Sequence, residues 1–245
     1  MPSTLSGDDE GGLWTEVANG QGVNMVLTGL GYMESGDTLL VAAFKKDGSA
    51  EEGRSGCILH VENGKMTEFP VSLEGSKPRS IIFDDEDALF IADEKKKSIL
   101  SRPPVVEGYE NFALVHTLVS EHEGKPLLGP HSMCFDDNGT LYFTDCGSLG
   151  TLNAPKGSVF CVSSQDQMLK PLAKGSLAHP TGIACNPTGS LVFVSETMAN
   201  RVVRFARRQN GVYYCSAYKT FRGGFGPSAL VCDEAGRLFV LRTDL

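Results

Sequence analysis

A segment that begins with a proline recurs along this chain at a nearly constant step. Each copy has two short apolar runs around a turn rich in Asp, Asn and Gly, and the copies read KPRSIIFDDEDALFIAD, GPHSMCFDDNGTLYFTD, HPTGIACNPTGSLVFVS and GPSALVCDEAGRLFVLR. Their prolines lie 52, 50 and 47 residues apart, at Pro78, Pro130, Pro180 and Pro227. A degenerate copy, LTGLGYMESGDTLLVAA, begins at Leu27, 51 residues before Pro78. Repeats of roughly 40–50 residues built from short strands predict the blades of a β-propeller.

Each repeat is long enough for four strands. The two apolar runs are too short, and too rich in β-branched and aromatic residues, for helices, so we expect them to form an antiparallel hairpin. Two more strands follow in the first repeat, at 57–62 and 65–71, joined by the hairpin signal Asn63 and Gly64. The corresponding later strands are expected at 98–102, 112–119, 158–163, 168–173, 201–206 and 212–218. The sequence therefore predicts an all-β chain with helix content near zero.

The repeats predict one β-propeller domain of the six-bladed type that lacks its C-terminal blade or blades. We expect blades at 23–72, 73–120, 121–174 and 175–221, and a partial blade at 222–245. A six-bladed closure needs roughly 60–70 more residues at this repeat length. The N-terminal segment 1–22 contains LWTEVA at 13–18, a possible closing strand. Three interpretations stay open: a truncated form, a ring of five irregular blades, or an open array.

Composition narrows the class of protein. The net charge of −8 and the pI near 5.2 disfavour binding to nucleic acids or anionic membranes, because both need a basic face. The polar, acidic N-terminus resembles no secretory or transit signal, and no apolar run approaches a membrane span. The seven cysteines form no CxxC pair, which disfavours a zinc site or a disulfide framework. We therefore expect a cytoplasmic protein with no nucleic-acid or membrane partner.

Blade geometry predicts where a functional site would lie. The first strand of each blade starts after the proline and runs down the central channel, and the second strand runs back. Residues one and fifteen positions after the proline should therefore share one rim. Strand starts supply Thr28, Arg79, His131, Thr181 and Ser228, and strand ends supply Asp93, Asp145, Ser195 and Arg242. A ring of side chains around a channel mouth is where propellers bind ligands.

The candidate catalytic residues on this rim are His131, Asp145, Arg79 and Asp93. His131 could act as a general base or transition-metal ligand oriented by Asp145, or could simply be a rim histidine bonded to a neighbouring loop. Arg79 with Asp93 could bind an anionic substrate, or the two could form a structural ion pair. The recurrence of Asp93 and Asp145 at equivalent positions favours loop capping over a catalytic dyad.

Other charged and histidine side chains near the rim are expected to have structural rather than catalytic roles. Glu196 and Arg201 are expected to form a pair that fixes a loop, and His179 is expected to be a loop residue before Pro180. We also expect hydrogen bonds among His131, Asp145 and Arg79 to hold the rim together.

The repeats resemble a known superfamily. PHSMCFDDNGTLYFTD and PTGIACNPTGSLVFVSE are similar to the repeats of six-bladed propellers that include NHL-repeat proteins, senescence-marker-protein/gluconolactonase enzymes and strictosidine-synthase-like proteins. SETMANRVVRF, from Ser195, resembles the strictosidine-synthase-like branch, and PKGSVFCVS, from Pro155, resembles the gluconolactonase branch. The resemblance covers about residues 25–242. It indicates the fold but not the activity, because one superfamily hosts unrelated chemistries.

The resemblance implies a site at the channel mouth. Gluconolactonase-like members share a divalent cation there, held by a Glu from the first blade and by Asn or Asp from later ones, at the residue after the proline. Here those positions hold Thr28, Arg79, His131, Thr181 and Ser228, a poor set for calcium, which prefers carboxylate oxygens. We therefore expect no metal and no cofactor. Resemblance to strictosidine synthase likewise implies no metal, but it places the catalytic Glu in the last blade, which we expect to be missing here.

Two classes of function remain. The main interpretation is a non-enzymatic binding or interaction module with a degenerate metal site, whose partner is a protein or a small molecule at the channel mouth. The alternative is a lactonase- or esterase-type hydrolase, or a strictosidine-synthase-like enzyme, that uses the remaining rim groups.

Overall fold

The computed structural model describes residues 25–45, 56–104, 114–147 and 156–242. The possible closing strand at 13–18 lies outside these residues. Within them the chain is all-β, and the one helical element is a 3-10 turn at Thr197–Ala199. The described residues include no helix with the length and hydropathy needed to cross a membrane.

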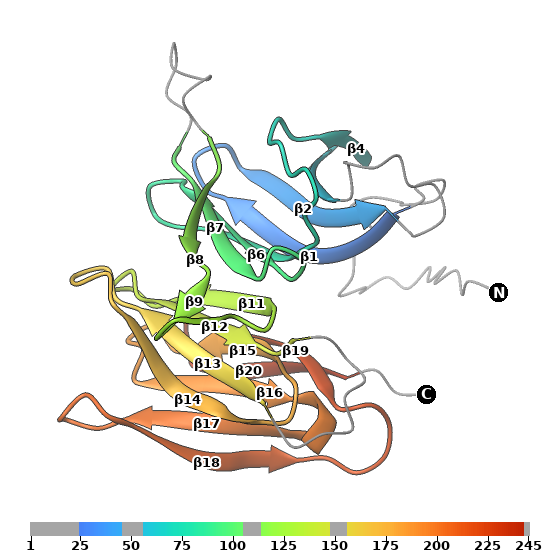
Figure 1. Cartoon of the computed structure of the whole chain (residues 1–245). Helices are drawn as coiled ribbons and strands as arrows, with labels where there is room; N and C mark the ends of the chain where they lie inside the picture. Colours follow the sequence, from blue (N-terminus) through green and yellow to red (C-terminus); the bar gives the residue numbers. More distant parts are fainter. Residues whose placement is uncertain (1–24, 46–55, 105–113, 148–155, 243–245) are drawn as a thin grey trace.

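Four repeats form four-stranded antiparallel sheets in which each strand pairs with the next along the chain (Figure 1). The first sheet contains β1 (Met25–Met33), β2 (Thr38–Lys45), β3 (Gly56–Glu62) and β4 (Lys65–Glu68). The second contains β5 (Pro78–Phe83), β6 (Leu89–Asp93), β7 (Ser98–Arg102) and β8 (His116–Val119). The third contains β11 (Pro130–Phe135), β12 (Leu141–Asp145), β13 (Gly157–Val162) and β14 (Leu169–Leu177). The fourth contains β15 (Pro180–Cys185), β16 (Leu191–Glu196), β17 (Arg201–Arg207) and β18 (Tyr213–Thr220).

Two shorter hairpins complete the described fold. The fifth repeat forms the two-stranded sheet of β19 (Pro227–Cys232) and β20 (Leu238–Arg242). A small hairpin that the repeat does not predict, β9 (Glu121–His122) and β10 (Lys125–Pro126), lies between the second and third sheets in the sequence. The hairpins expected from the apolar runs are confirmed.

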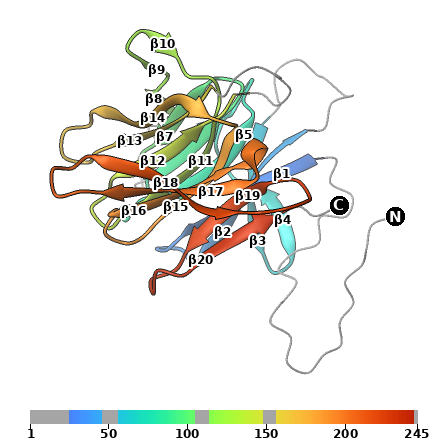
Figure 2. The same ribbon diagram turned by 90° about the horizontal axis from the view of Figure 1, so that it is seen from below.

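The sheets are arranged as the blades of a propeller (Figure 2). The first strands β1, β5, β11, β15 and β19 pack against one another in chain order. Apolar side chains fill the spaces between successive sheets, as in the cluster that joins Tyr142 and Val159 of the third blade to Ile183 and Val192 of the fourth. Burial of these faces is the main stabilising contribution, at about 25 cal/mol per Å² of apolar surface.

Each repeat has a small residue at the second position after its proline, or after Leu27 in the first repeat. Close packing of the first strands explains why this residue is small. This position holds Gly29, Ser80, Ser132, Gly182 and Ala229. A Cβ on Gly29 would lie 2.9 Å from the Cα of Ser80, and one on Gly182 would lie 2.8 Å from the Cα of Ala229. The inner strands therefore approach too closely for larger residues.

The register of the fourth blade differs by one residue from that of the second and third. Pro78 lies opposite Asp93 and Pro130 opposite Asp145, but Pro180 lies opposite Glu196 rather than Ser195. The cause is a longer turn, because the N–H of Asn186 bonds to the carbonyl of Leu191, five residues on. In the third blade the equivalent bond, from Asp136 to Thr140, spans four residues. The expected equivalence of Ser195 to Asp93 and Asp145 is therefore wrong, although Ser195 Oγ does lie 2.9 Å from Oγ1 of the rim residue Thr181.

Candidate functional site

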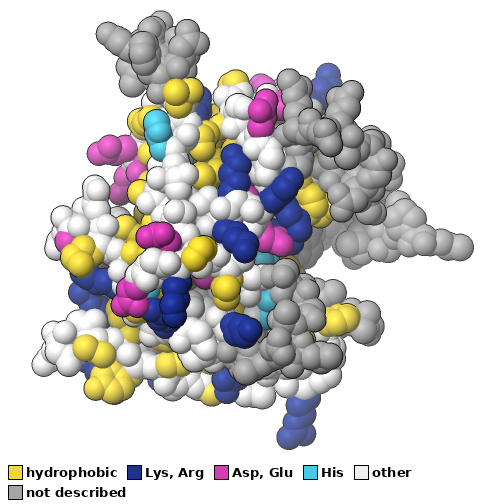
Figure 3. Space-filling view, in the orientation of Figure 1, with side chains coloured by type: hydrophobic (Ala, Val, Ile, Leu, Met, Phe, Trp, Pro, Cys, Tyr) yellow, Lys and Arg dark blue, Asp and Glu magenta, His cyan; other side chains and the backbone are white. Residues whose placement is uncertain are grey.

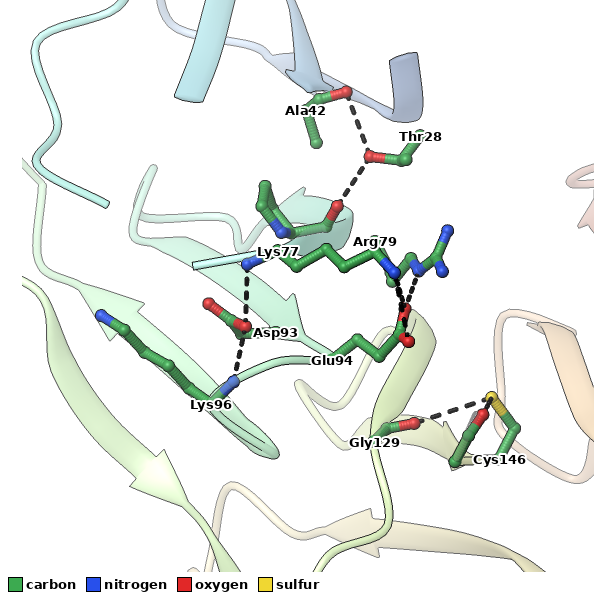
Figure 4. A network of polar contacts seen from close by, with 11 residues as sticks. Thr28, Ala42, Lys77, Arg79, Asp93, Glu94, Lys96, Gly129 and Cys146 are labelled. Atoms are coloured by element: carbon green, nitrogen blue, oxygen red, sulfur yellow. Dashed lines mark hydrogen bonds and ion pairs between the residues drawn. The ribbon is translucent and has the colours of Figure 1, made fainter. Parts of the chain in front are cut away.

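The candidate site, here called the channel mouth, comprises the residues that follow each proline and the ends of the second strands. Figure 4 shows the polar contacts of this region around Thr28, Arg79 and Glu94. Two of its hydroxyl groups bind neighbouring backbone. Thr28 Oγ1 donates to the carbonyl of Pro78 at 2.7 Å. Thr181 Oγ1 is 3.0 Å from the carbonyl of Ser228, in the next blade. These threonines therefore connect adjacent blades.

Acidic side chains at the ends of the second strands cap the loops before the prolines. Asp93 Oδ1 accepts from the backbone N–H of Lys77 at 3.1 Å and from that of Lys96 at 2.9 Å. Asp145 Oδ1 accepts from the N–H of Leu128 at 2.9 Å and of Gly129 at 2.7 Å. The loop-capping interpretation of Asp93 and Asp145 is therefore confirmed.

Glu196 has the equivalent role in the fourth blade. Its Oε1 accepts from the N–H of Ala178 at 2.8 Å, and its Oε2 accepts from Nε of Arg201 at 2.5 Å. Glu196 is 2% exposed, so the arginine neutralises a buried carboxylate. The predicted pair of Glu196 and Arg201 is confirmed.

The predicted pairing of Arg79 with Asp93 is wrong. Nε of Arg79 donates to the carboxylate of Glu94, which Lys77 also approaches, with Nζ 3.3 Å from Oε2 (Figure 4). Asp93 instead accepts from loop amides at Oδ1, and its buried Oδ2 has no hydrogen-bond partner among the described residues. The sequence analysis missed Glu94, and its position directly after Asp93 at a strand end was the available signal.

Arg79 is held from two sides. Besides the ion pair with Glu94, its guanidinium carbon lies 5.6 Å from the ring centre of Phe44, and Lys77 Nζ lies 5.2 Å from the same centre. Burial raises the pKa of Glu94, but its hydrogen bond and charge interactions with Arg79 and Lys77 outweigh this and lower the pKa overall. The mouth thus carries a fixed guanidinium beside an ionised carboxylate.

His131 lies at this mouth as a neutral imidazole. Its buried Nδ1 has no hydrogen-bond partner among the described residues. Burial, followed by the positive charges of Arg79 and His179, lowers the pKa of His131 to about 4, although Glu94 opposes the shift. The expected hydrogen bonds joining His131, Asp145 and Arg79 are therefore wrong. Asp145 is engaged by backbone amides and Arg79 by Glu94.

The structure also brings His179 and Cys146 to the mouth. His179 has a left-handed backbone, with φ of 56°, which is uncommon for a residue with a side chain. Burial lowers the pKa of His179, and nearby Glu94 opposes this shift. Burial raises the pKa of the Cys146 thiol to about 12, so this thiol is protonated at neutral pH and is a poor nucleophile. His179 therefore belongs to the candidate site.

The donor set does not fit a calcium ion. Thr28 and Thr181 are engaged with backbone carbonyls, and Arg79 places a positive charge where a cation would bind. No group of three or more His, Cys, Asp or Glu residues within the described ranges could hold a metal ion. Over the face shown in Figure 3, basic and acidic side chains are interspersed.

Comparisons with known proteins agree with this architecture. Lactonase drp35 from Staphylococcus haemolyticus is 30% identical over 112 residues, which cover 44% of this chain and 34% of that protein. The match thus spans about a third of the relative's length. A gluconolactonase from Xanthomonas campestris superposes with a TM-score of 0.67 at 20% identity, covering 87% of this chain and 69% of that one. Regucalcin from Agrobacterium tumefaciens, a calcium-binding protein, gives 0.62 at 16% identity, covering 89% and 67%.

The match to a family model covers most of the repeats. Residues 52–244 match the model described as the SMP-30/Gluconolactonase/LRE-like region, which includes the last four proline-led segments and the rim residues from Arg79 onward. The solved neighbours share the propeller fold. Because the match extends over more than half of its length, this chain belongs to the SMP-30/gluconolactonase/LRE-like family.

Proposed function

We propose that the protein is a lactonase-type hydrolase that opens lactones or related esters at the channel mouth. Family membership and the lactonase and gluconolactonase relatives support this class of reaction. The structural observation that carries the proposal is His131, a neutral imidazole with an unpartnered buried Nδ1, beside the fixed guanidinium of Arg79. Ionisable groups with strongly shifted pKa values in a concave site are candidates for proton transfer.

In the proposed reaction His131 is the general base. The imidazole accepts a proton from water as the water oxygen attacks the ester carbonyl carbon, and the carbonyl oxygen becomes an oxyanion. The positive charge of Arg79 stabilises that oxyanion. Collapse of the tetrahedral intermediate breaks the bond between the carbonyl carbon and the ring oxygen, which takes the proton from the imidazolium. The product is a hydroxy acid.

Glu94 and Phe44 act through Arg79 in this proposal. The carboxylate and the ring fix the guanidinium, so little reorganisation is needed when the oxyanion forms. His179 adds a second imidazole near the same groups, since its pKa responds to both Glu94 and Arg79. It can bind the substrate as a hydrogen-bonding partner.

A second candidate function is a non-enzymatic binding module. Two observations favour it. The described rim lacks the carboxylate ring that suits a calcium ion, and a pKa of about 4 makes His131 a weak base. In such a module Arg79 would bind an anionic ligand without catalysing a reaction.

The test is hydrolysis of a panel of γ- and δ-lactones and aryl esters by the purified protein. We expect turnover that His131→Ala lowers about 100-fold or more, the usual contribution of a general base. His116→Ala is the matched control, because His116 is exposed on β8, away from the mouth. Absence of turnover across the panel, or equal activity in His131→Ala, would favour the binding module.

A further inference from the structure

A pocket of about 350 Å³ lies on the third blade, beside the rim residue Asp145. Its walls come from the end of β9, from β10 and the two residues that follow it, from the end of β12, and from Lys156, β13 and β14. The pocket is therefore formed where the unpredicted hairpin lies against the last three strands of a blade. Its size is at the lower end of the range for small-molecule sites.

The floor of this pocket is apolar and well packed. Leu127 and Phe160, which line it, are only 2% and 3% exposed. The ring centre of Phe160 lies 5.2 Å from that of His122 and 5.5 Å from that of Phe143. Leu128, 39% exposed, adds an accessible apolar wall. An apolar group placed here would contact a fixed surface.

Lysines line the same pocket, namely Lys125, Lys156 and Lys174. Three lysines at one pocket contrast with the net charge of −8 over the whole chain. Lys174 pairs with the exposed carboxylate of Glu123. Within the described residues no ion pair involves Lys156, and Lys125 interacts with Glu123 through charge at longer range.

The acidic groups near these lysines are few. Asp145 lines the pocket, but its carboxylate accepts hydrogen bonds from the backbone amides of Leu128 and Gly129. Glu123 belongs to the pair with Lys174. The lysines thus exceed these carboxylates by a single positive charge, which matches a monoanion better than a dianion.

We propose that this pocket binds a small amphipathic carboxylate, with the apolar part on Leu127, Leu128 and Phe160 and the head group between Lys125 and Lys156. The ammonium groups supply charge-assisted hydrogen bonds, and the floor supplies burial of apolar surface. Phosphate could share this charge recognition, but no arginine lines the pocket to bind it in a bidentate manner. This proposal does not rest on the proposed lactonase activity.

Calorimetry of the purified full chain tests the site with octanoate, octanol and octyl phosphate as probes. We expect octanoate to bind, and Lys125→Ala/Lys156→Ala to raise its Kd about tenfold or more, because two charge-assisted contacts are lost. Both lysines are exposed, so the double variant should melt like the parent protein. Lys170→Ala is the control, since Lys170 lies on β14 but outside the pocket and pairs with Asp166.

Four results would overturn the proposal. Octanoate could fail to bind, the double variant could bind it unchanged, or Lys170→Ala could weaken binding equally, which would indicate unspecific charge attraction. Tighter binding of octyl phosphate or octanol than of octanoate would contradict the carboxylate head group. Repeating the titration in His131→Ala separates this site from the mouth, because we expect an unchanged Kd there.

Discussion

The guanidinium of Arg79 and the carboxylate of Glu94 form an ion pair across the first two strands of one blade, at the mouth of the channel. Lys77 joins the same carboxylate, and the ring of Phe44 lies beneath both cations. The arrangement fixes one positive charge beside a neutral imidazole. The proposed hydrolysis depends on that combination.

Replacing Glu94 should release Arg79. For Glu94→Gln we expect about a tenfold loss of kcat/KM, because the oxyanion partner is no longer fixed. Stability should fall by only about 1 kcal/mol, the upper range for a partly exposed ion pair. The pKa of His131 should fall further, since Glu94 is the group that raises it. Steady-state kinetics and a proton NMR titration measure both effects.

The control for this variant is Glu86→Gln, in an exposed turn. If Glu94→Gln leaves kcat/KM and the His131 titration as they are in the parent protein, the positioning role assigned to Glu94 is wrong.

Burial of His131 should make stability depend on pH. Its pKa in the folded protein is about 4, below the ordinary value of 6.5. As the pH falls below 6.5, the unfolded chain binds a proton that the folded protein does not, so stability is lost between pH 6.5 and about 4. Between these two pH values we expect the free energy of unfolding of His131→Gln to fall by about 1–3 kcal/mol less than that of the parent protein.

Urea melts of both proteins at several pH values measure that difference. Parallel losses of stability in parent and variant would show that His131 titrates normally in the folded state.

The Asp145 side chain should stabilise the fold mainly by accepting hydrogen bonds rather than by carrying a charge. For Asp145→Ala we expect a loss of about 1–3 kcal/mol, because the amides of Leu128 and Gly129 lose their partner. Asp145→Asn should cost less, since its amide oxygen can still accept, and burial already raises the pKa of the carboxyl group. Thermal melts rank the two variants, and the reverse order would contradict this account.

Close approach of the inner strands should make Gly182 intolerant of a side chain. A Cβ there would lie 2.8 Å from the Cα of Ala229, so Gly182→Ala should cost about 1–3 kcal/mol through strand displacement. Gly36→Ala is the control, because its nearest neighbours would be the flexible side chains of Thr38 and Met33. Equal melting temperatures for the two variants would show that the blades adjust without cost.

The fold was predictable because the repeat sets both the strand pattern and its period. Apolar runs around turns such as the one at Asp136 and Gly139 specify hairpins locally, and the recurrence of the pattern specifies the blades. The β9–β10 hairpin was not predicted, because the other repeats have no counterpart of it and it has only two residues per strand.

The site was only partly predictable from the sequence. The position after the proline correctly brings Arg79 and His131 near each other, since strand direction fixes that end of the blade. The partner of each side chain depends on local features, such as turn length, that the spacing of the repeats does not specify. One extra residue in a turn places Glu196 rather than Ser195 opposite Pro180.

The partner of Arg79 also could not be predicted from the spacing of the repeats. Asp93 was the expected partner of Arg79, but loop amides bind its carboxylate and the next residue, Glu94, takes the role. His179 has a left-handed backbone, a conformation that the residues around Pro180 do not specify.

The most direct test of the proposed hydrolysis is kcat/KM for a lactone substrate as a function of pH, from about 3.5 to 8, in the presence of a chelator and corrected for spontaneous ring opening. With His131 as the base, kcat/KM should rise with an apparent pKa near the folded value of about 4 and reach a plateau at neutral pH. His131→Ala should lose both the rise and the plateau. Activity that disappears with the chelator and returns with calcium, or a profile that His131→Ala leaves unchanged, would contradict the account.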